Sequence, residues 1–380
     1  MRIFFYEFRK IFTVGMIALL AVASVIFYFL FLSFEFDHFP NGRPDRDIFK
    51  ITVEEIAKHG PTMDEQQLAN FRERYDKQVE EANRFLHTRP EFVSAGITTY
   101  QAFQKIDLER EDMQKLRNQV IFDEQVDIFW ELQAREFIID RYLNKESWLE
   151  GRGENEEQRA RGHEIYLSGE ADSILPWFVW RNYNQLIVFE SILITLSVLL
   201  MLTPYYLKER RNRMFDLQYS TRTGRTLFRT KWLAGCTAAL MFTTLHLGCF
   251  FALYSMNETA PFWQAGISSV LNDYASWFDL TFGAYIGITI VAIFVLALFT
   301  SVIALFVSRL APSYFAAVGI QVPFAFVLWS LLLEYLLHDI SSIRQSTYLL
   351  IIAYALLVTS AIVITALRWR RERVTDIHAA

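Results

Sequence analysis

Residues 208–231, KERRNRMFDLQYSTRTGRTLFRTK, separate two long apolar runs and are rich in positive charge. They contain eight Lys and Arg residues but only two acidic residues, Glu209 and Asp216. Short loops with such an excess of Lys and Arg stay on the cytoplasmic side of a membrane. The segment is therefore predicted to be a cytoplasmic loop, hereafter the basic loop, between two transmembrane helices.

A short amphipathic patch lies in the middle of the basic loop. It contains Met214, Phe215, Leu217 and Tyr219 and ends at the turn-forming residues 220–224. Apolar side chains on a short cytosolic helix are typical of a surface that enters a partner's groove. The alternative is an ordinary basic loop whose apolar residues dip into the lipid headgroups.

The apolar residues of the chain gather into runs of about 20 residues with few charges, the length needed to span a bilayer as a helix. The six runs are Ile11–Phe34, Leu186–Leu207, Trp232–Tyr254, Leu280–Val307, Tyr314–Leu337 and Tyr348–Leu367. A water-soluble fold has no use for such runs, and a membrane barrel would show shorter alternating strands. The predicted fold is an all-α polytopic membrane protein with six transmembrane helices.

Charge is distributed unevenly between the segments that join these runs. Residues 35–180 hold 31 acidic and 19 basic residues, a net charge of −12. The segments 1–10, 207–231 and 368–380, together with Arg309, hold 16 basic and five acidic residues. The positive-inside rule then predicts a multi-pass protein of the cell membrane with both termini in the cytoplasm.

The chain divides accordingly. We predict a cytoplasmic interfacial amphipathic helix (1–10), a first span (11–34), a large helical extracytoplasmic domain (35–183), a second span (184–207), the basic loop (208–231), spans three to six (232–367) and a cytoplasmic tail (368–380). A frayed lead-in is the alternative for the first ten residues.

Apolar periodicity predicts two long helices inside the 35–183 domain, over residues 64–86 and about 120–148. Their apolar faces are expected to form the core of that domain. A later outside loop, Ser255 to Asp279, is rich in aromatic residues and is predicted to be a half-helix or re-entrant piece at the outer interface.

Motifs for chemistry are missing from the sequence. It contains no G-x-x-x-x-G-K-[ST], no G-x-S-x-G and no His spacing suited to a metal. We therefore expect a chain that is not an enzyme and carries no cofactor or metal.

The ionisable exceptions inside the apolar runs are Glu190, His246 and Glu334. A charge in the bilayer is costly, so these side chains are candidates for a translocation path. Snorkelling to the interface is the alternative for Glu190.

The order of these segments resembles the membrane subunits of type 2 ABC exporters, the ABC-2 type permeases. In that family the corresponding loop has a Glu-headed basic run, a small residue and Thr, then Ser-Arg and a closing Lys. Glu209, Ser220, Thr221, Arg225 and Lys231 fit this pattern. Arg213-Met214 stands where Gly-Thr is common, and Arg222 stands where Pro is common.

The resemblance implies a partnership. Two permease copies, or one copy and a paralogue, would each bind a separate ATP-binding subunit through this loop, and ATP and Mg²⁺ would be held by that subunit. Glu209, Met214, Phe215 and Tyr219 are the expected coupling contacts. Arg222, Arg225, Arg229 and Lys231 are expected to anchor the loop to membrane lipids. No nucleic-acid partner is expected.

Two functions compete on this basis. The first is an exporter permease that moves an amphiphile such as a peptide, lipid or drug. The second is a non-transporting transducer or sensor that acts through its extracytoplasmic domain. A receptor domain on a six-span anchor, with no ATPase partner, is a further alternative.

Overall fold

The structure, a computed structural model, describes residues 2–151, 153–212 and 224–374, and for residues 224–226, 333, 334, 373 and 374 it describes the backbone alone. The chain forms two compact units. The membrane unit comprises Met1–Asp37, Asn182–Glu258 and Tyr285–Ala380, and the inserted unit comprises His38–Arg181 and Thr259–Ala284. The chain therefore passes between the two units four times.

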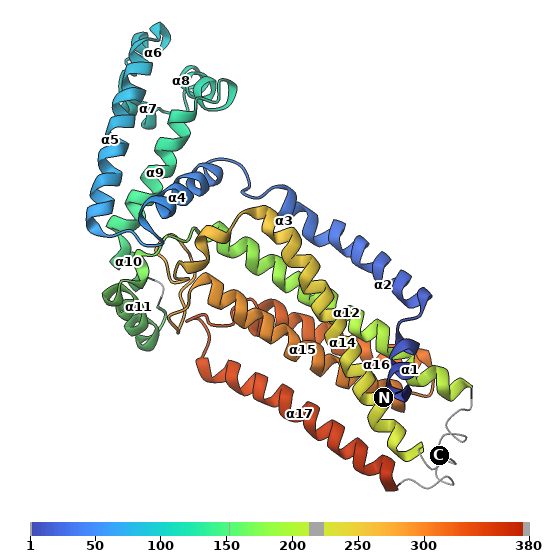
Figure 1. The fold of residues 1–380 in the computed structure, drawn as a ribbon. Coiled ribbons are helices and arrows are strands. Elements are labelled where there is room, and N and C mark those ends of the chain that lie inside the picture. The colour runs from blue at the N-terminus through green and yellow to red at the C-terminus, as the bar shows by residue number, and fades with distance from the viewer. Residues whose placement is uncertain (1, 152, 213–223, 375–380) are drawn as a thin grey trace. The chain divides into compact units, whose positions relative to one another are not determined.

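Most of the described residues are helical, and the rest form turns, irregular loops and two isolated β-bridges; Figure 1 labels the helices. The helices that build the membrane unit are α1 (Arg2–Ile11), α2 (Val14–Phe27), α3 (Ser33–Asp37), α12 (Trp177–Arg211), α14 (Gly224–Tyr254), α15 (Phe282–Leu310), α16 (Tyr314–Leu331) and α17 (Thr347–Val374). A π-helical turn, Tyr28–Leu32, joins α2 to α3 without a break.

Six helices in the described chain are long and apolar enough to cross a membrane, which confirms the predicted polytopic all-α class. They are Val14–Asp37, Trp177–Arg211, Leu227–Asn257, Phe282–Leu310, Tyr314–Leu331 and Thr347–Glu372. Each overlaps one of the predicted runs. The helices of the second and third spans extend past the apolar runs at both ends, because the polar residues that flank the runs continue the helix.

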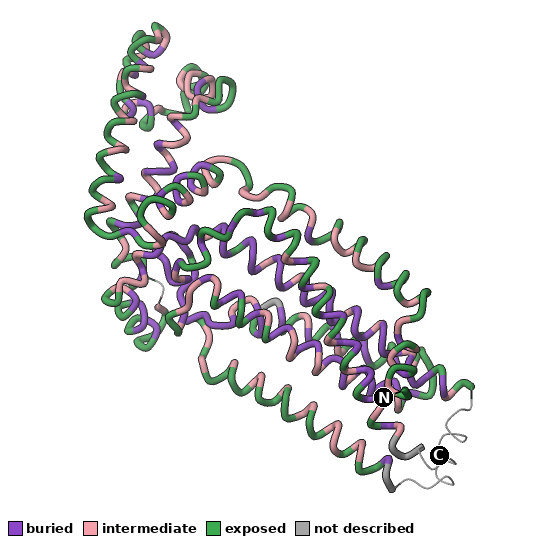
Figure 2. The backbone as a smooth tube through the Cα atoms, in the orientation of Figure 1, coloured by how far each residue is buried: buried purple, intermediate pink, exposed green. Residues whose placement is uncertain are grey.

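The second span is the central helix of the membrane unit. Of its most apolar 18-residue window, 83% is buried, whereas the corresponding share is 17% for the first span and zero for the sixth (Figure 2). The main apolar core joins Val198 and Leu202 of α12 to Trp232 of α14 and Leu305 of α15. Ile11 at the end of α1 is buried in the same core.

Polar side chains hold together the end of the membrane unit from which the chain enters the inserted unit. Asn182 Nδ2 donates to the carbonyl oxygen of Glu35 at 2.9 Å, and Asn257 Nδ2 donates to Asn182 Oδ1 at 2.9 Å. Tyr285 OH donates to Asn184 Oδ1 at 2.8 Å. The four crossings therefore start from one end of the membrane unit, and the basic loop leaves α12 and enters α14 at their opposite ends.

The inserted unit is helical. Its helices are α4 (Asp45–His59), α5 (Glu65–His87), α6 (Pro90–Ser94), α7 (Tyr100–Gln104), α8 (Glu111–Asn118), α9 (Asp127–Leu143), α10 (Lys145–Glu150) and α11 (Glu156–Ser168). The predicted 64–86 helix is confirmed as α5, which begins at a capping box between Asp64 and Gln67. One apolar core is built on Leu86, Phe92, Phe103 and Phe129.

The prediction of one continuous helix over residues 120–148 is wrong, because the structure interrupts it twice. A π-helical turn, Gln119–Asp123, ends one segment, and α9 starts only at Asp127. Gln125 between them has a φ of 49°, which no helical residue adopts. A second break at Asn144 separates α9 from α10.

The aromatic loop 255–279 also differs from the prediction. Apart from the short 3₁₀ turns Ser255–Asn257 and Ala260–Gln264, it is not helical, and from Thr259 onward it belongs to the inserted unit. Phe262, Ile267 and Leu271 are fully buried there. The Trp177 backbone N–H donates to the carbonyl of Leu271 at 2.9 Å, and Trp180 stacks on Tyr274 with 4.3 Å between ring centroids. This loop therefore completes the inserted unit, and the predicted half-helix is wrong.

Candidate functional site

The two ends of the basic loop are joined by a buried ion pair. Glu209 lies in the last turn of α12, and Lys231 lies in the first turns of α14. The Lys231 ammonium contacts Glu209 Oε2, and both side chains are almost completely buried. A charge in such a place requires an opposite charge, because burial removes its hydration. The pair fixes the distance between the second and third spans where the loop leaves them.

The N-terminal helix α1 joins this ion pair. Lys10 Nζ lies 2.9 Å from Glu209 Oε1 and 3.1 Å from Glu7 Oε1, while Tyr205 OH donates to Glu7 Oε2 at 2.8 Å. We call Glu7, Lys10, Tyr205, Glu209 and Lys231 the loop-base cluster. It holds two carboxylates and two ammonium groups, so its charges balance. Burial lowers the pKa of Lys10, but the hydrogen bonds and charges of Glu209 and Glu7 outweigh it and the pKa is raised.

Glu209 was predicted to be a coupling contact, but its side chain is buried. Its carboxylate is already shared between Lys10 and Lys231. Glu209 thus positions the loop, and a partner could reach its carboxylate only by displacing an ammonium group. Met214, Phe215 and Tyr219, the other predicted coupling residues, lie outside the described residues, so their role stays a prediction.

The residues predicted to anchor the loop to lipid lie in different surroundings. Lys231 is buried in the loop-base cluster, so its ammonium does not face headgroups as predicted. Arg229 is exposed, and its guanidinium lies 4.5 Å from the centre of the Trp369 ring of α17. This cation–π geometry suits an interface between water and lipid. Arg222 and the side chain of Arg225 lie outside the described part of the chain.

Glu190 and His246, two of the three intramembrane ionisable residues singled out from the sequence, meet in the structure. His246 Nδ1 lies 2.9 Å from Glu190 Oε1, although the residues are 56 positions apart. Ser24 of the first span lies 3.4 Å from the other ring nitrogen, Nε2. The carboxylate is buried, so interfacial snorkelling does not describe Glu190. The third residue, Glu334, lies in a π-helical turn, Leu332–Leu336, and its side chain is not described.

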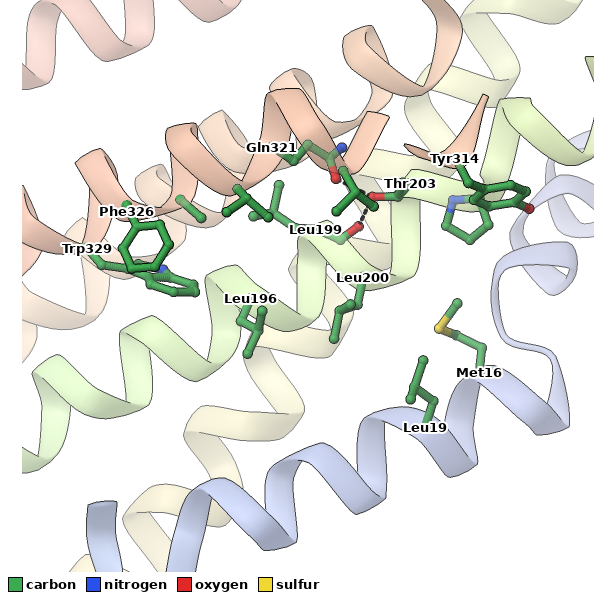
Figure 3. Close-up of a pocket in the computed structure, with 14 residues that line it drawn as sticks. Met16, Leu19, Leu196, Leu199, Leu200, Thr203, Tyr314, Gln321, Phe326 and Trp329 are labelled. Carbon is green, nitrogen blue, oxygen red and sulfur yellow. Dashed lines mark hydrogen bonds between the residues drawn. The ribbon is translucent and has the colours of Figure 1, made fainter. Parts of the chain in front are cut away.

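A groove lies between three of the spans. Its volume is about 400 Å³, and it is lined by Met16 and Leu19 of α2, by residues 196–204 of α12 and by residues 314–329 of α16 (Figure 3). Most of the lining side chains are apolar. The groove therefore suits an apolar chain.

Polar atoms mark two places in the groove wall. Thr203 Oγ1 lies 2.5 Å from Gln321 Oε1 and 2.5 Å from the carbonyl oxygen of Leu199, as Figure 3 shows. The amide nitrogen of Gln321 is buried and has no hydrogen-bond partner among the described residues. Trp329 Nε1 donates to Thr195 Oγ1 at 3.1 Å. The Thr203 hydroxyl has one hydrogen for two acceptor oxygens, so the Gln321 amide also fits with its nitrogen toward Thr203. In either orientation one polar atom of this buried amide has no partner among the described residues, which favours a water molecule or a ligand with a polar group there.

Sequence reasoning did not find the residues that α1 contributes. Glu7 and Lys10 have helical i, i+3 spacing, a signal that predicts a surface ion pair rather than a buried one. Gln321 and Thr203 are single polar residues in apolar spans, and such residues commonly bond within their own helix. Only the packing of α1 and α16 against the other spans identifies these roles.

A second charged cluster holds the aromatic loop in the inserted unit. Arg161 Nε donates to the Ser276 carbonyl at 3.0 Å, and Arg161 Nη2 lies 2.7 Å from Asp279 Oδ1 and 3.2 Å from Glu170 Oε1. Burial, followed by a hydrogen bond with Asp279, raises the pKa of Glu170 to about 7. The hydrogen bonds from Glu170 and Arg161 lower the pKa of Asp279. The two carboxyl groups therefore share a proton below neutral pH.

Comparison with known proteins gives no match: no family model fits the chain, and neither curated proteins nor solved structures resemble it closely enough to count. The function therefore rests on the geometry above and on the segment order.

Proposed function

We propose that this chain is the membrane subunit of an ATP-driven exporter of the ABC-2 type, which couples to a separate ATP-binding subunit through the basic loop. The observation that carries the proposal is the loop-base cluster. Glu209 and Lys231 join the two ends of the loop, and Lys10 joins both to α1. A push on the loop would therefore move the second span, the third span and α1 together, as a coupling element must.

The groove supports an amphiphilic substrate. Its lining is apolar, and it contains one buried amide, Gln321, whose nitrogen lacks a partner among the described residues. An apolar chain would displace water from the groove, and a polar group on that chain would bond to the amide. A lipid, a lipopeptide or an apolar drug has both features. A small, strongly charged solute lacks the apolar chain.

The partner interaction is tested by purification from native membranes. A protein in which Met214→Asp is combined with Phe215→Asp is expected to lose a P-loop ATPase that co-purifies with the wild type, because two carboxylates would prevent an apolar patch from entering a groove. The control combines Leu143→Asp with Leu167→Asp, which places the same charges on exposed apolar residues of the inserted unit. Equal recovery of the ATPase with both variants would refute the coupling assignment.

The inserted unit favours a second candidate, a non-transporting transducer. Four chain crossings link this unit to the first four spans, so a movement of the spans would act on it at four points. ATP-dependent uptake of amphiphiles into inverted vesicles that contain both subunits separates the candidates. Uptake supports the exporter, whereas hydrolysis that moves none of the offered amphiphiles supports the transducer.

A further inference from the structure

Side chains from three spans meet inside the membrane unit. Glu190 of α12 contacts His246 Nδ1 of α14 at 2.9 Å, and Ser24 of α2 contacts His246 Nε2 at 3.4 Å. The carboxylate side chain is 5% exposed and the imidazole 15% exposed. Neither forms a further ion pair among the described residues. Burial of the pair, with only the neutral Ser24 of the first span as a further contact, restricts how many protons Glu190 and His246 can hold together.

Hydrogen bonding fixes the proton on Nε2. The Ser24 hydroxyl donates its proton to the carbonyl of Leu20 at 2.9 Å, so its oxygen is free to accept from His246. Nε2 therefore carries hydrogen. The reverse arrangement, in which Ser24 donates to Nε2, would give up the shorter bond to Leu20. It would also leave a neutral imidazole beside a negative carboxylate.

The Nδ1 contact then requires one more proton. Two acceptors cannot approach to 2.9 Å without a hydrogen between them. This proton belongs either to the imidazole, giving an imidazolium and a carboxylate, or to the carboxyl group, giving two neutral groups. Both forms have zero net charge, which is the state that a low-dielectric environment favours.

No other charged side chain lies within one helical turn of Ser24, Glu190 or His246 on their own helices, and the described residues add no further ion pair to the group. The Phe242 ring lies against the imidazole with 4.4 Å between centroids. Within one helical turn of the three residues, the remaining titratable side chains are Tyr28 on the first span and Cys249 on α14. Both are uncharged at neutral pH. Loss of the shared proton would therefore leave the Glu190 carboxylate buried and unpaired.

We propose that Glu190 and His246 form a one-proton binding site within the membrane, and that release of this proton weakens the packing of the first three spans. The ligand is the proton itself. The site is independent of the proposed ATP-driven function, since it requires only the membrane unit. Because the shared proton is lost in alkaline solution, the membrane unit is less stable there.

Thermal unfolding of the purified full-length protein in detergent micelles tests the proposal, from about pH 6 to about pH 10, which covers the usual range of histidine titration. In the Glu190→Gln variant the new side-chain amide would donate to Nδ1 while Nε2 donates to Ser24, so every contact survives without the shared proton. The unfolding midpoint of the wild type is expected to fall relative to E190Q by about 3 °C or more across this range.

A second His–acid pair provides the matched control. His338 Nδ1 lies 3.1 Å from Asp339 Oδ1, but both side chains are partly exposed. Asp339→Asn is expected to keep the wild-type trend. The proposal is wrong if E190Q follows the wild type over the whole range, or if D339N removes the trend as E190Q does.

Nitrogen-15 NMR of histidine-labelled wild-type protein gives a test that does not depend on E190Q folding. The His246 signal is assigned by substituting the six other histidines in turn. At about pH 7 its two ring-nitrogen shifts are expected to show a hydrogen on Nε2 and a hydrogen-bonded Nδ1 that shares a second hydrogen with Glu190. A neutral His246 that carries its hydrogen on Nδ1 alone would overturn the one-proton site.

Discussion

Glu209 and Lys231 are 22 positions apart and yet share a hydrogen bond at the base of the basic loop. Their environment explains why a charged pair is retained in a largely apolar part of the chain. A buried pair adds little net stability compared with an apolar pair, but removal of one partner leaves an unpaired charge. The pair thus specifies one geometry for the loop ends and penalises others.

Glu209→Gln is expected to destabilise the protein by about 3 kcal/mol, because the Lys231 ammonium would remain buried without its carboxylate. Chemical unfolding in detergent micelles measures the change. Combining Glu209→Gln with Lys231→Met removes both charges and should recover much of the loss. Lys208→Met, at an exposed position one residue away, serves as the control and should change stability by less than about 0.5 kcal/mol. Equal losses for Glu209→Gln and Lys208→Met would contradict the role of the cluster.

Glu170 gives the inserted unit a pH dependence of known sign. Its pKa is raised to about 7, so the folded state holds a proton that the unfolded chain releases at lower pH. The stability from this group is present in acid and is lost as the pH rises through about 7. Glu170→Gln, which resembles the protonated form, should unfold at the same temperature as the wild type near about pH 4, below the ordinary glutamate pKa, and at a higher temperature near about pH 8.

The exposed Glu81→Gln substitution in α5 is the control for this titration, and it should follow the wild type at both pH values. If the difference in unfolding temperature between the wild type and Glu170→Gln is the same at both pH values, Glu170 is not protonated in the folded state.

Among the elements, α1 shows how a predicted amphipathic helix can serve two surfaces. Its apolar residues were expected to lie in the membrane interface. Phe5 and Tyr6 are indeed exposed, but Ile11 is 3% exposed and packs in the main core of the membrane unit. The helix packs against α14, at the end where the basic loop enters the third span.

Truncation of α1 side chains should therefore have unequal effects. Ile11→Ala is expected to cost about 2–4 kcal/mol, since it leaves a cavity in a closed core. Ile3→Ala, at a position that is about half exposed, should cost less than about 0.5 kcal/mol. Unfolding midpoints of the two variants in the same detergent measure the difference. Similar midpoints would mean that α1 is not part of the folded core.

For the molecule as a whole, the charge distribution predicts sidedness, with the basic loop inside and the inserted unit outside the cell. Cysteine labelling checks it in a background where Cys236 and Cys249 are replaced by Ala. Leu167→Cys, at an exposed site of α11, should react with a membrane-impermeant maleimide on intact cells. Asn212→Cys, exposed at the start of the basic loop, should react only after permeabilisation. The reverse pattern would overturn the predicted orientation.

The sequence by itself determined the six spans and the α5 helix, because both depend on local periodicity. A run of about 20 apolar residues must be helical in lipid, whatever surrounds it. It could not determine that the 120–148 pattern is interrupted at Gln125, because the apolar spacing continues across the turn. Nor did it assign residues 259–284 to the inserted unit, because their aromatic content suits an interface equally well.

The tertiary structure alone decided which polar residues meet. Glu190 and His246 were each recognisable as costly in lipid, but the cost does not say which partner offsets it. Glu209, Lys231 and Lys10 likewise come from three separate helices. Apolar periodicity is a property of neighbouring positions along one helix, whereas a buried charge is stabilised by whichever opposite charge the packing of different helices brings to it.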